Sequence, residues 1–302
     1  MKDNRNEMMV SILTLAYNHE PYIRQCLDGI VMQQTNFKFE LLIHDDASTD
    51  GTAEIIREYE AKYPEIVKPI YQTENQYSKH VPIGTTYLYP RAQGKYIALC
   101  EGDDYWTDPL KLQKQVDFLE ANPEYVLCGH NITAYNERTA SFEPFNTGID
   151  GTYELTDLIS KGVFCSTLSV VFKRDALVLE RYNSYRKVID ITLAYHLLSQ
   201  GKGYCMNEEM AVYRIHDGGI WSGSNDDARI VTNIEIRTAI YDAEKSDEAA
   251  TFLEAFLYNL GRLWIIRHLP IFSKTIHRVF LQFGLAHTAK TLMNILSKLS
   301  KP

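Results

Sequence analysis

The chain of 302 residues lacks several features that would place it in other classes of protein. It has no run of about eighteen apolar residues, so we expect no membrane-spanning helix. Its first ten residues contain no apolar run of the kind that a secretory signal needs. Its five cysteines are widely spaced without a Cys-x-x-Cys or Cys/His metal pattern, which argues against a zinc site and fits reduced thiols. We therefore expect a cytoplasmic protein.

Glycine-rich motifs for nucleotides are absent as well. No Gly-x-Gly-x-x-Gly follows an apolar run, which argues against a dinucleotide-dependent oxidoreductase. A nucleotidyltransferase would normally carry a glycine-rich loop with a basic residue after its first strand. At that place the chain instead has Ala16-Tyr17-Asn18-His19-Glu20.

Acidic residues are missing from the C-terminal tail. Residues 255–302 contain seven Lys and Arg residues and no Asp or Glu, while the rest of the chain is strongly acidic. An acidic body argues against nucleic acid as a partner. For the tail we expect helical packing up to Pro270. After it, we expect peripheral contact of the basic, apolar segment with the inner face of an anionic membrane.

Apolar runs and helical patterns alternate along the first half of the chain. This alternation predicts an α/β fold with a largely parallel central sheet. From about residue 229 onward the pattern is helical, with Pro270 as a break. The predicted strands span 8–16, 39–44, 67–71, 96–100 and 125–128, and the predicted helices span 21–31, 53–62 and 108–119.

Two pairs of aspartates follow two of the predicted strands. Asp45 and Asp46 come after the second strand, and Asp103 and Asp104 come after the fourth. Ligands of open α/β sheets bind beyond the carboxyl ends of the strands. Adjacent carboxylates repel each other unless a cation or hydrogen-bond donors accompany them, so the second pair predicts a hard divalent cation bound with phosphate oxygens. Turn formation and helix capping are the alternative explanation, above all for the first pair.

Three segments in this order, 10–18, 45–52 and 101–106, resemble those of the inverting family 2 glycosyltransferases of GT-A fold, as found in bacterial surface-polysaccharide assembly. The resemblance implies a Rossmann-like domain over residues 1–227, with a mostly parallel sheet flanked by helices, and a helical C-terminal region over residues 228–302. It also implies transfer of a sugar from a nucleotide diphosphate sugar, usually a UDP-sugar, to a hydroxyl of a glycan or lipid-linked acceptor.

The resemblance further implies roles for residues that bind the nucleotide. Leu15 and Tyr17 would line the pocket of the base, and Asp46 would accept a hydrogen bond from the base. Asp103 would contact the ribose.

The resemblance also implies a metal site for Mn²⁺ or Mg²⁺. Asp103 and Asp104 would hold the cation, and one sequence leaves open which of the two is the ligand. His216, beside a Gly-Gly turn, would complete the metal shell. An imidazole with a carboxylate suits Mn²⁺ better than Ca²⁺.

Inverting transfer needs a base that takes the proton of the acceptor hydroxyl. Residues 188–193 resemble the helix start that carries this base in the family, so Asp190 is the candidate, with a plain helix N-cap as the alternative.

The chain departs from the family pattern at Glu101 and before the fourth strand, where Lys79 or Arg91 would replace the usual polar segment. Two alternatives stay open: a nucleotidyltransferase acting on sugar phosphates, and a catalytically silent partner protein, which these departures would fit.

Overall fold

The computed structural model describes residues 7–145, 149–162, 164–185, 189–219 and 226–267. Within it the chain divides into two compact units, each of which is described separately. The larger unit contains the sheet and extends to His216, and the smaller one contains the last two described helices.

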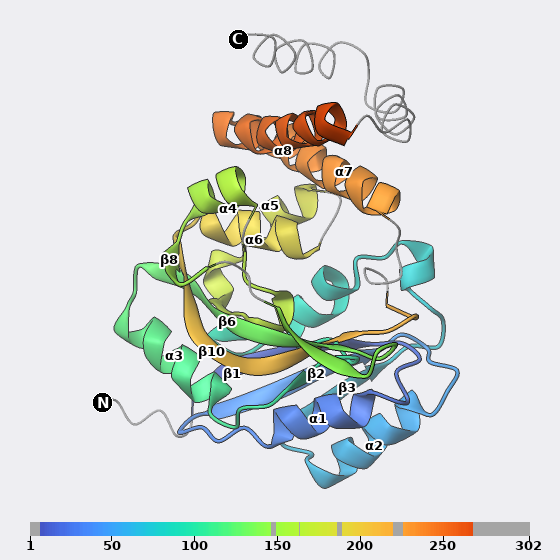
Figure 1. The fold of residues 1–302 in the computed structure, drawn as a ribbon. Coiled ribbons are helices and arrows are strands. Elements are labelled where there is room, and N and C mark those ends of the chain that lie inside the picture. The colour runs from blue at the N-terminus through green and yellow to red at the C-terminus, as the bar shows by residue number, and fades with distance from the viewer. Residues whose placement is uncertain (1–6, 146–148, 163, 186–188, 220–225, 268–302) are drawn as a thin grey trace. The chain divides into compact units, whose positions relative to one another are not determined.

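Ten strands of the described residues form one mixed sheet in the larger unit (Figure 1). The strands are β1 (Met8–Ala16), β2 (Lys38–Asp45), β3 (Val67–Tyr71), β4 (Tyr96–Leu99), β5 (Tyr105–Trp106), β6 (Tyr125–Asn136), β7 (Ser141–Phe145), β8 (Gly151–Tyr153), β9 (Val171–Lys173) and β10 (Lys202–Ile215). Their order is β3-β2-β1-β4-β9-β6-β10-β5, with β7 paired to β6 and β8 paired to β10.

The helices cover the sheet because its central strands are apolar on both faces. Figure 1 shows α1 (Ile23–Val31) and α2 (Thr52–Lys62) on one face and α6 (Asp190–Leu198) on the other. The remaining helices are α3 (Lys111–Ala121), α4 (Leu155–Lys161), α5 (Leu179–Ser184), α7 (Asp226–Glu244) and α8 (Asp247–Arg267). Short helical turns are η1 (Tyr77–Lys79), η2 (Gly84–Leu88), η3 (Tyr89–Arg91), η4 (Thr167–Ser169) and η5 (Arg174–Ala176).

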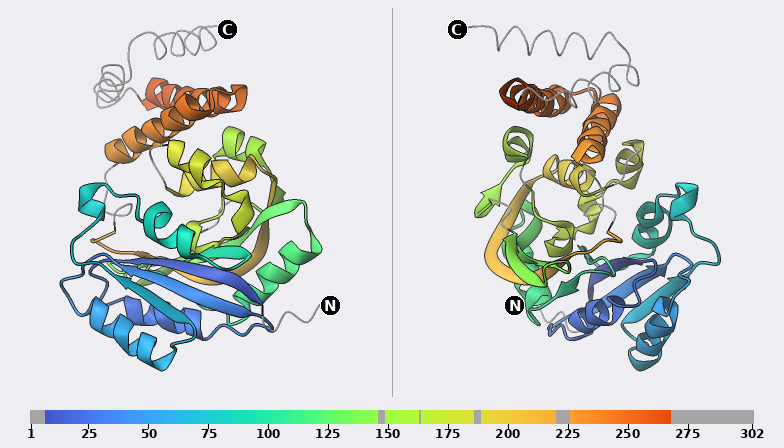
Figure 2. Two further views of the ribbon diagram at one scale, coloured as in Figure 1. Left: turned by 180° about the vertical axis from the view of Figure 1, so that it is seen from behind. Right: turned by 45° about the vertical axis from the view of Figure 1, so that its right-hand side comes forward.

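The parallel part of the sheet agrees with the sequence-based expectation, and the rest of the sheet adds to it. Strands β3, β2, β1 and β4 pair in parallel, and so do β6 and β10. Strands β5, β7, β8 and β9 pair antiparallel with their neighbours, which the sequence pattern did not predict. Strand β6 also runs well past its predicted end. Figure 2 shows the strong curvature of the long strand β10, which has register shifts along its pairing with β6.

The smaller unit is built around the packing of α7 against α8. Ile234, Ile240 and Phe252 are buried in it. Arg237 is buried as well, with its guanidinium 4.4 Å from the ring centre of Phe252 and 4.2 Å from that of Phe256.

Helices α7 and α8 are the described part of the C-terminal region. None of the helices in the described ranges has the length and apolar character that a membrane crossing requires. The segment after Pro270, for which we expect membrane contact, lies outside the described residues.

Candidate functional site

The carboxyl ends of β1, β2 and β4 bring both acidic pairs to one edge of the sheet. The N–H of Asp46 donates to the carbonyl of Ala16 at 2.9 Å, and the N–H of Gly102 donates to the carbonyl of Leu15 at 2.9 Å. The end of β1 therefore holds the loop after β2 on one side and the loop after β4 on the other. This convergence follows from the parallel pairing of the three strands.

Asp46 anchors a neighbouring segment of backbone. Its side chain is buried, and its carboxylate accepts the N–H groups of Gln76 at 2.7 Å and Tyr77 at 2.9 Å. Tyr17 is exposed and Leu15 is half-buried, so both can meet a ligand at this edge. The contacts of these three residues with a nucleotide base stay predictions.

Asp103 lies between two histidines. The Nε2 atom of His216 is 3.1 Å from its Oδ2 atom, and the Nε2 atom of His19 is 3.9 Å from the same oxygen. Burial opposes the ionisation of Asp103, but the hydrogen bond with His216 and the charges of both histidines hold its pKa below the ordinary value. Burial lowers the pKa of His19, although the charge of Asp103 acts against this shift.

His19 was not among the residues singled out from the sequence. Its Nδ1 atom is buried without a hydrogen-bond partner. A Cβ atom on Gly102 would lie 2.7 Å from that nitrogen and 3.0 Å from the carbonyl oxygen of Leu15. Only glycine therefore fits beside His19 without a shift, and this close approach explains the glycine directly before the aspartate pair.

Asp104 ties the acidic loop to the end of β10. Its buried Oδ1 atom accepts the N–H of Arg214 at 2.8 Å, and the Nε atom of Arg214 donates to the carbonyl of Asp103 at 2.9 Å. Burial, reinforced by the charge of Asp103, raises the pKa of Asp104 well above its ordinary value. These bonds bring His216, two residues beyond Arg214, to the loop after β4.

Two donors at this edge have a spacing compatible with a divalent cation. Two ligands at about 2.1 Å from an octahedral ion, at right angles, lie about 3 Å apart. The oxygen of Asp103 and the Nε2 atom of His216 have this separation. Within the described residues no group of three or more His, Cys, Asp and Glu side chains could hold a metal ion, so phosphate oxygens would have to supply the other ligands. Asp104 is engaged with Arg214, and its role as a ligand stays a prediction.

Two further carboxyl groups, those of Glu101 and Asp190, interact electrostatically. Burial, followed by the charges of Asp103 and Asp190, raises the pKa of Glu101 to about 8. Burial also raises the pKa of Tyr89, and the charges of Glu101 and Asp190 add to that shift. The charge of Asp190 therefore acts on both Glu101 and Tyr89.

Asp190 is the first residue of α6. The N-cap is Ile189, whose N–H donates to the hydroxyl of Thr192 at 2.9 Å, so the helix is capped by Thr192. As a whole residue, Asp190 is exposed. Its carboxyl group is more enclosed: burial raises the pKa of this group, and the nearby Thr167 acts against that shift. The side chain of Asp190 is therefore available to a substrate.

The two basic residues proposed to replace the family's polar segment have local partners. Lys79 forms an ion pair with Glu74, and Arg91 donates to the carbonyl of Tyr87 at 2.7 Å. Their part in gripping a diphosphate stays a prediction.

Comparison with known proteins identifies the family. The family model for glycosyl transferase family 2 matches residues 11–178. Rv1520, an uncharacterized protein of Mycobacterium tuberculosis, is 38% identical over 231 residues, which are 73% of this chain and 62% of that protein. TuaG of Bacillus subtilis, a glycosyltransferase named for teichuronic acid biosynthesis, is 31% identical over 216 residues, which are 71% of this chain and 82% of that protein. The chain therefore belongs to glycosyl transferase family 2.

Solved structures agree on the fold. TarS 1–349 of S. aureus in complex with UDP-GlcNAc aligns with a TM-score of 0.65 at 18% identity, covering 96% of this chain and 80% of that one. The mannosyltransferase PcManGT of Pyrobaculum calidifontis, in complex with GDP-Man and Mn²⁺, aligns with a TM-score of 0.58 at 17% identity, covering 97% and 81%. The predicted GT-A fold with a helical C-terminal region is confirmed.

Proposed function

We propose that this chain is an inverting glycosyltransferase that moves a sugar from a nucleotide diphosphate sugar to a hydroxyl of a glycan or lipid-linked acceptor. The observation that carries the proposal is the position of Asp103 between His19 and His216 at the carboxyl edge of the sheet. Family membership supports the proposal, and the bound UDP-GlcNAc of TarS makes a UDP-sugar the first donor to test.

The donor's diphosphate would bind at Asp103 and His216 with Mn²⁺ or Mg²⁺. The bound cation would offset the negative charge of the departing nucleoside diphosphate. Asp103 is suited to this task because its pKa is held low, so that its carboxylate is ionised at neutral pH. Leu15, Tyr17 and Asp46 would form the wall beside the nucleoside.

Asp190 would act as the base for the acceptor. Its carboxylate takes the proton of the acceptor hydroxyl while the oxygen of that hydroxyl bonds to the anomeric carbon of the donor. The bond from this carbon to the diphosphate oxygen breaks on the opposite side, and its electron pair leaves with the nucleoside diphosphate. Attack from that side inverts the anomeric configuration.

The place of action is proposed from the relatives and from the tail. TuaG is named for teichuronic acid biosynthesis, which makes a bacterial glycan the first acceptor class to test. We propose a cytoplasmic protein with peripheral contact at the inner face of the membrane, made by the basic tail.

The test is release of nucleoside diphosphate from UDP-, GDP-, dTDP- and CDP-sugars with Mn²⁺, with and without a bacterial glycan and lipid extract. One donor class should give release that the extract accelerates. Asp190→Asn should lower this rate by about 10²- to 10⁴-fold, the usual contribution of a general base. Asp175→Asn changes an exposed carboxylate in η5 and serves as the matched control. Release at an equal rate from both variants would refute Asp190 as the base.

A further inference from the structure

The hydroxyl of Thr167 is held in place by a well-anchored turn. The turn η4 is fixed from both sides, because Trp106 donates its indole N–H to the carbonyl of Leu168 at 2.9 Å and Gln115 donates to the carbonyl of Ser169 at 2.8 Å. The hydroxyl of Ser169 also bonds back to Ser166 at 2.7 Å. The backbone position of Thr167 is therefore set by the strand that follows the acidic loop and by α3.

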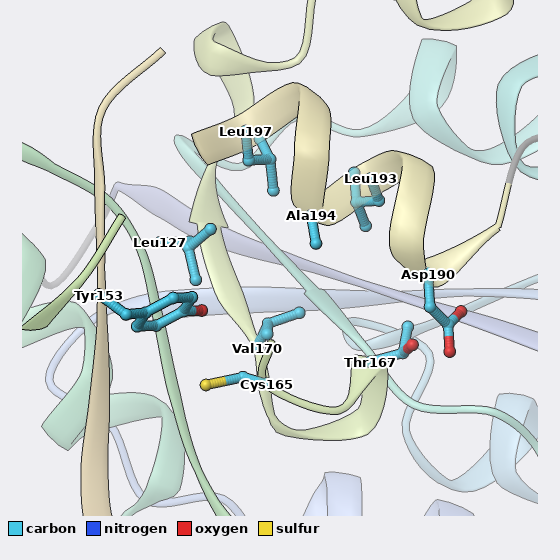
Figure 3. Close-up of a pocket in the computed structure, with 9 residues that line it drawn as sticks. All are labelled: Leu127, Tyr153, Cys165, Thr167, Val170, Asp190, Leu193, Ala194 and Leu197. Atoms are coloured by element: carbon cyan, nitrogen blue, oxygen red, sulfur yellow. The ribbon is translucent and has the colours of Figure 1, made fainter. Parts of the chain in front are cut away.

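This hydroxyl has an unusual environment. The Oγ1 atom of Thr167 is buried and has no hydrogen-bond partner, a condition that costs free energy. Figure 3 shows Thr167 and Asp190 facing each other at one end of a small cavity beneath α6. The cavity has space for about one water molecule. Most of its other walls are apolar, formed by residues such as Leu127, Val170 and Leu193, and these side chains cannot accept a hydrogen bond.

We propose that Thr167 is a positioning residue for Asp190: its hydroxyl donates a hydrogen bond to the Asp190 carboxylate and aims this carboxylate at the acceptor hydroxyl. The inference rests on the proposed role of Asp190 as the base. This hydrogen bond would satisfy the buried hydroxyl of Thr167. The same bond stabilises the ionised form of Asp190, which is the form that takes a proton.

The other groups around Asp190 act in both senses, and the backbone N–H of Asp190 itself also lowers the pKa of its carboxyl. Glu101, in the loop after β4, and Tyr89, in η3, both interact with the charge of Asp190, and the negative charge of an ionised Glu101 disfavours a second charge at Asp190. Burial disfavours that charge too. Thr167 is thus the side-chain hydroxyl near Asp190 that offsets these effects.

The experiment compares Thr167→Val, Thr167→Ala and Thr167→Ser with the wild-type chain. The rate of nucleoside diphosphate release is measured as kcat/KM from pH 5 to 9, with Mn²⁺, the accepted donor and the acceptor extract. Binding of the nucleoside diphosphate and thermal unfolding are measured alongside. Thr167→Val keeps the shape of the side chain and removes the hydroxyl. Thr167→Ala also removes the hydroxyl, with a smaller side chain, and serves if the valine variant does not fold. Thr167→Ser keeps the hydroxyl.

We expect the acid limb of the pH profile to move to higher pH in Thr167→Val and Thr167→Ala, because the pKa of Asp190 rises when the bond is lost. On the plateau kcat/KM should fall by about 10-fold, the value of one hydrogen bond to a charged group. Nucleotide affinity should stay unchanged, and Thr167→Ser should restore the acid limb.

Two outcomes distinguish a failure of the proposal for Thr167 from a failure of the base assignment for Asp190. A wild-type acid limb in folded Thr167→Val and Thr167→Ala, with Asp190→Asn inactive, would overturn the role of Thr167 and leave the proposed function intact. Full activity in Asp190→Asn would overturn the base assignment itself, and with it the role of Thr167.

Discussion

Lys111 tests how much the burial of a charged side chain costs in this fold. It is fully buried on α3, and its Nζ atom donates to Oε1 of Gln115 at 2.8 Å and lies 4.1 Å from the ring centre of Trp106. Burial lowers its pKa from 10.5 to about 7, despite an opposite effect of the nearby thiols Cys100 and Cys128. We predict that Lys111→Met changes the pH dependence of stability.

The sign follows from proton binding. Below pH 7 the lysine is charged in both the native and the unfolded state, and its burial then costs about 5 kcal/mol, which is the pKa difference at 1.36 kcal/mol per unit. Between pH 7 and 10.5 the unfolded state binds the proton and the native state does not, so native stability rises with pH. From pH 7 to 9 the wild-type chain should gain about 2 kcal/mol relative to Lys111→Met.

The assay is urea unfolding of both proteins at pH 6, 7, 8 and 9, without nucleotide or metal. The quantity of interest is the difference between the two free energies of unfolding, because pH effects from other groups cancel in it. Lys62→Met, at an exposed lysine of α2, is the matched control and should keep the wild-type pH dependence. A difference between Lys111→Met and wild type that stays constant from pH 7 to 9 would refute the reasoning.

Three further predictions concern the loop after β4. Burial and the charge of Asp103 raise the pKa of Glu101 to about 8, so the native state keeps a proton that the unfolded state loses above pH 4.5. Glu101→Gln should therefore gain about 3 kcal/mol over wild type between pH 5 and 7 in urea unfolding, and an unchanged difference would contradict this. Gly102→Ala should lose about 1–3 kcal/mol of stability because its Cβ would meet His19, and full stability would show that the ring can move freely. Asp104→Ala leaves the buried N–H of Arg214 unpaired and should cost about 1–3 kcal/mol more than Asp104→Asn, whose amide oxygen can still accept; equal losses would argue against this bond.

Local patterns in the sequence predicted the parallel half of the fold and the convergence of the two acidic pairs. Strand length, apolar character and alternation with helices decide β1, β2 and β4, and the carboxyl ends of parallel strands must share an edge. The positions of Asp46 and Asp103 at one edge of the sheet followed from this rule.

The rest of the site depends on contacts between residues that are far apart in the chain. The bond from Arg214 to Asp104 spans 110 residues, and the turn around Thr167 is fixed by Trp106, which is 62 residues from Leu168. Short antiparallel strands such as β5 and β9 have too few residues to show a period. His19 follows β1 in a loop whose sequence alone gives no sign of its approach to Asp103. One usable signal was Gly102, because a glycine directly before an acidic pair can mark a point where another residue packs closely against the backbone.

The most direct test of the central claim is calorimetric titration of UDP, GDP, dTDP and CDP into the protein, with and without Mn²⁺. The account predicts that one nucleotide binds with a Kd in roughly the micromolar range. That binding should require Mn²⁺ and weaken by at least about 10-fold in Asp103→Asn, since a ligand of the cation is lost. Asp175→Asn should bind as the wild type does. Two results would contradict the assignment of the donor site: none of the four nucleotides binds to the folded protein, or Asp103→Asn binds the nucleotide as tightly as the wild type does.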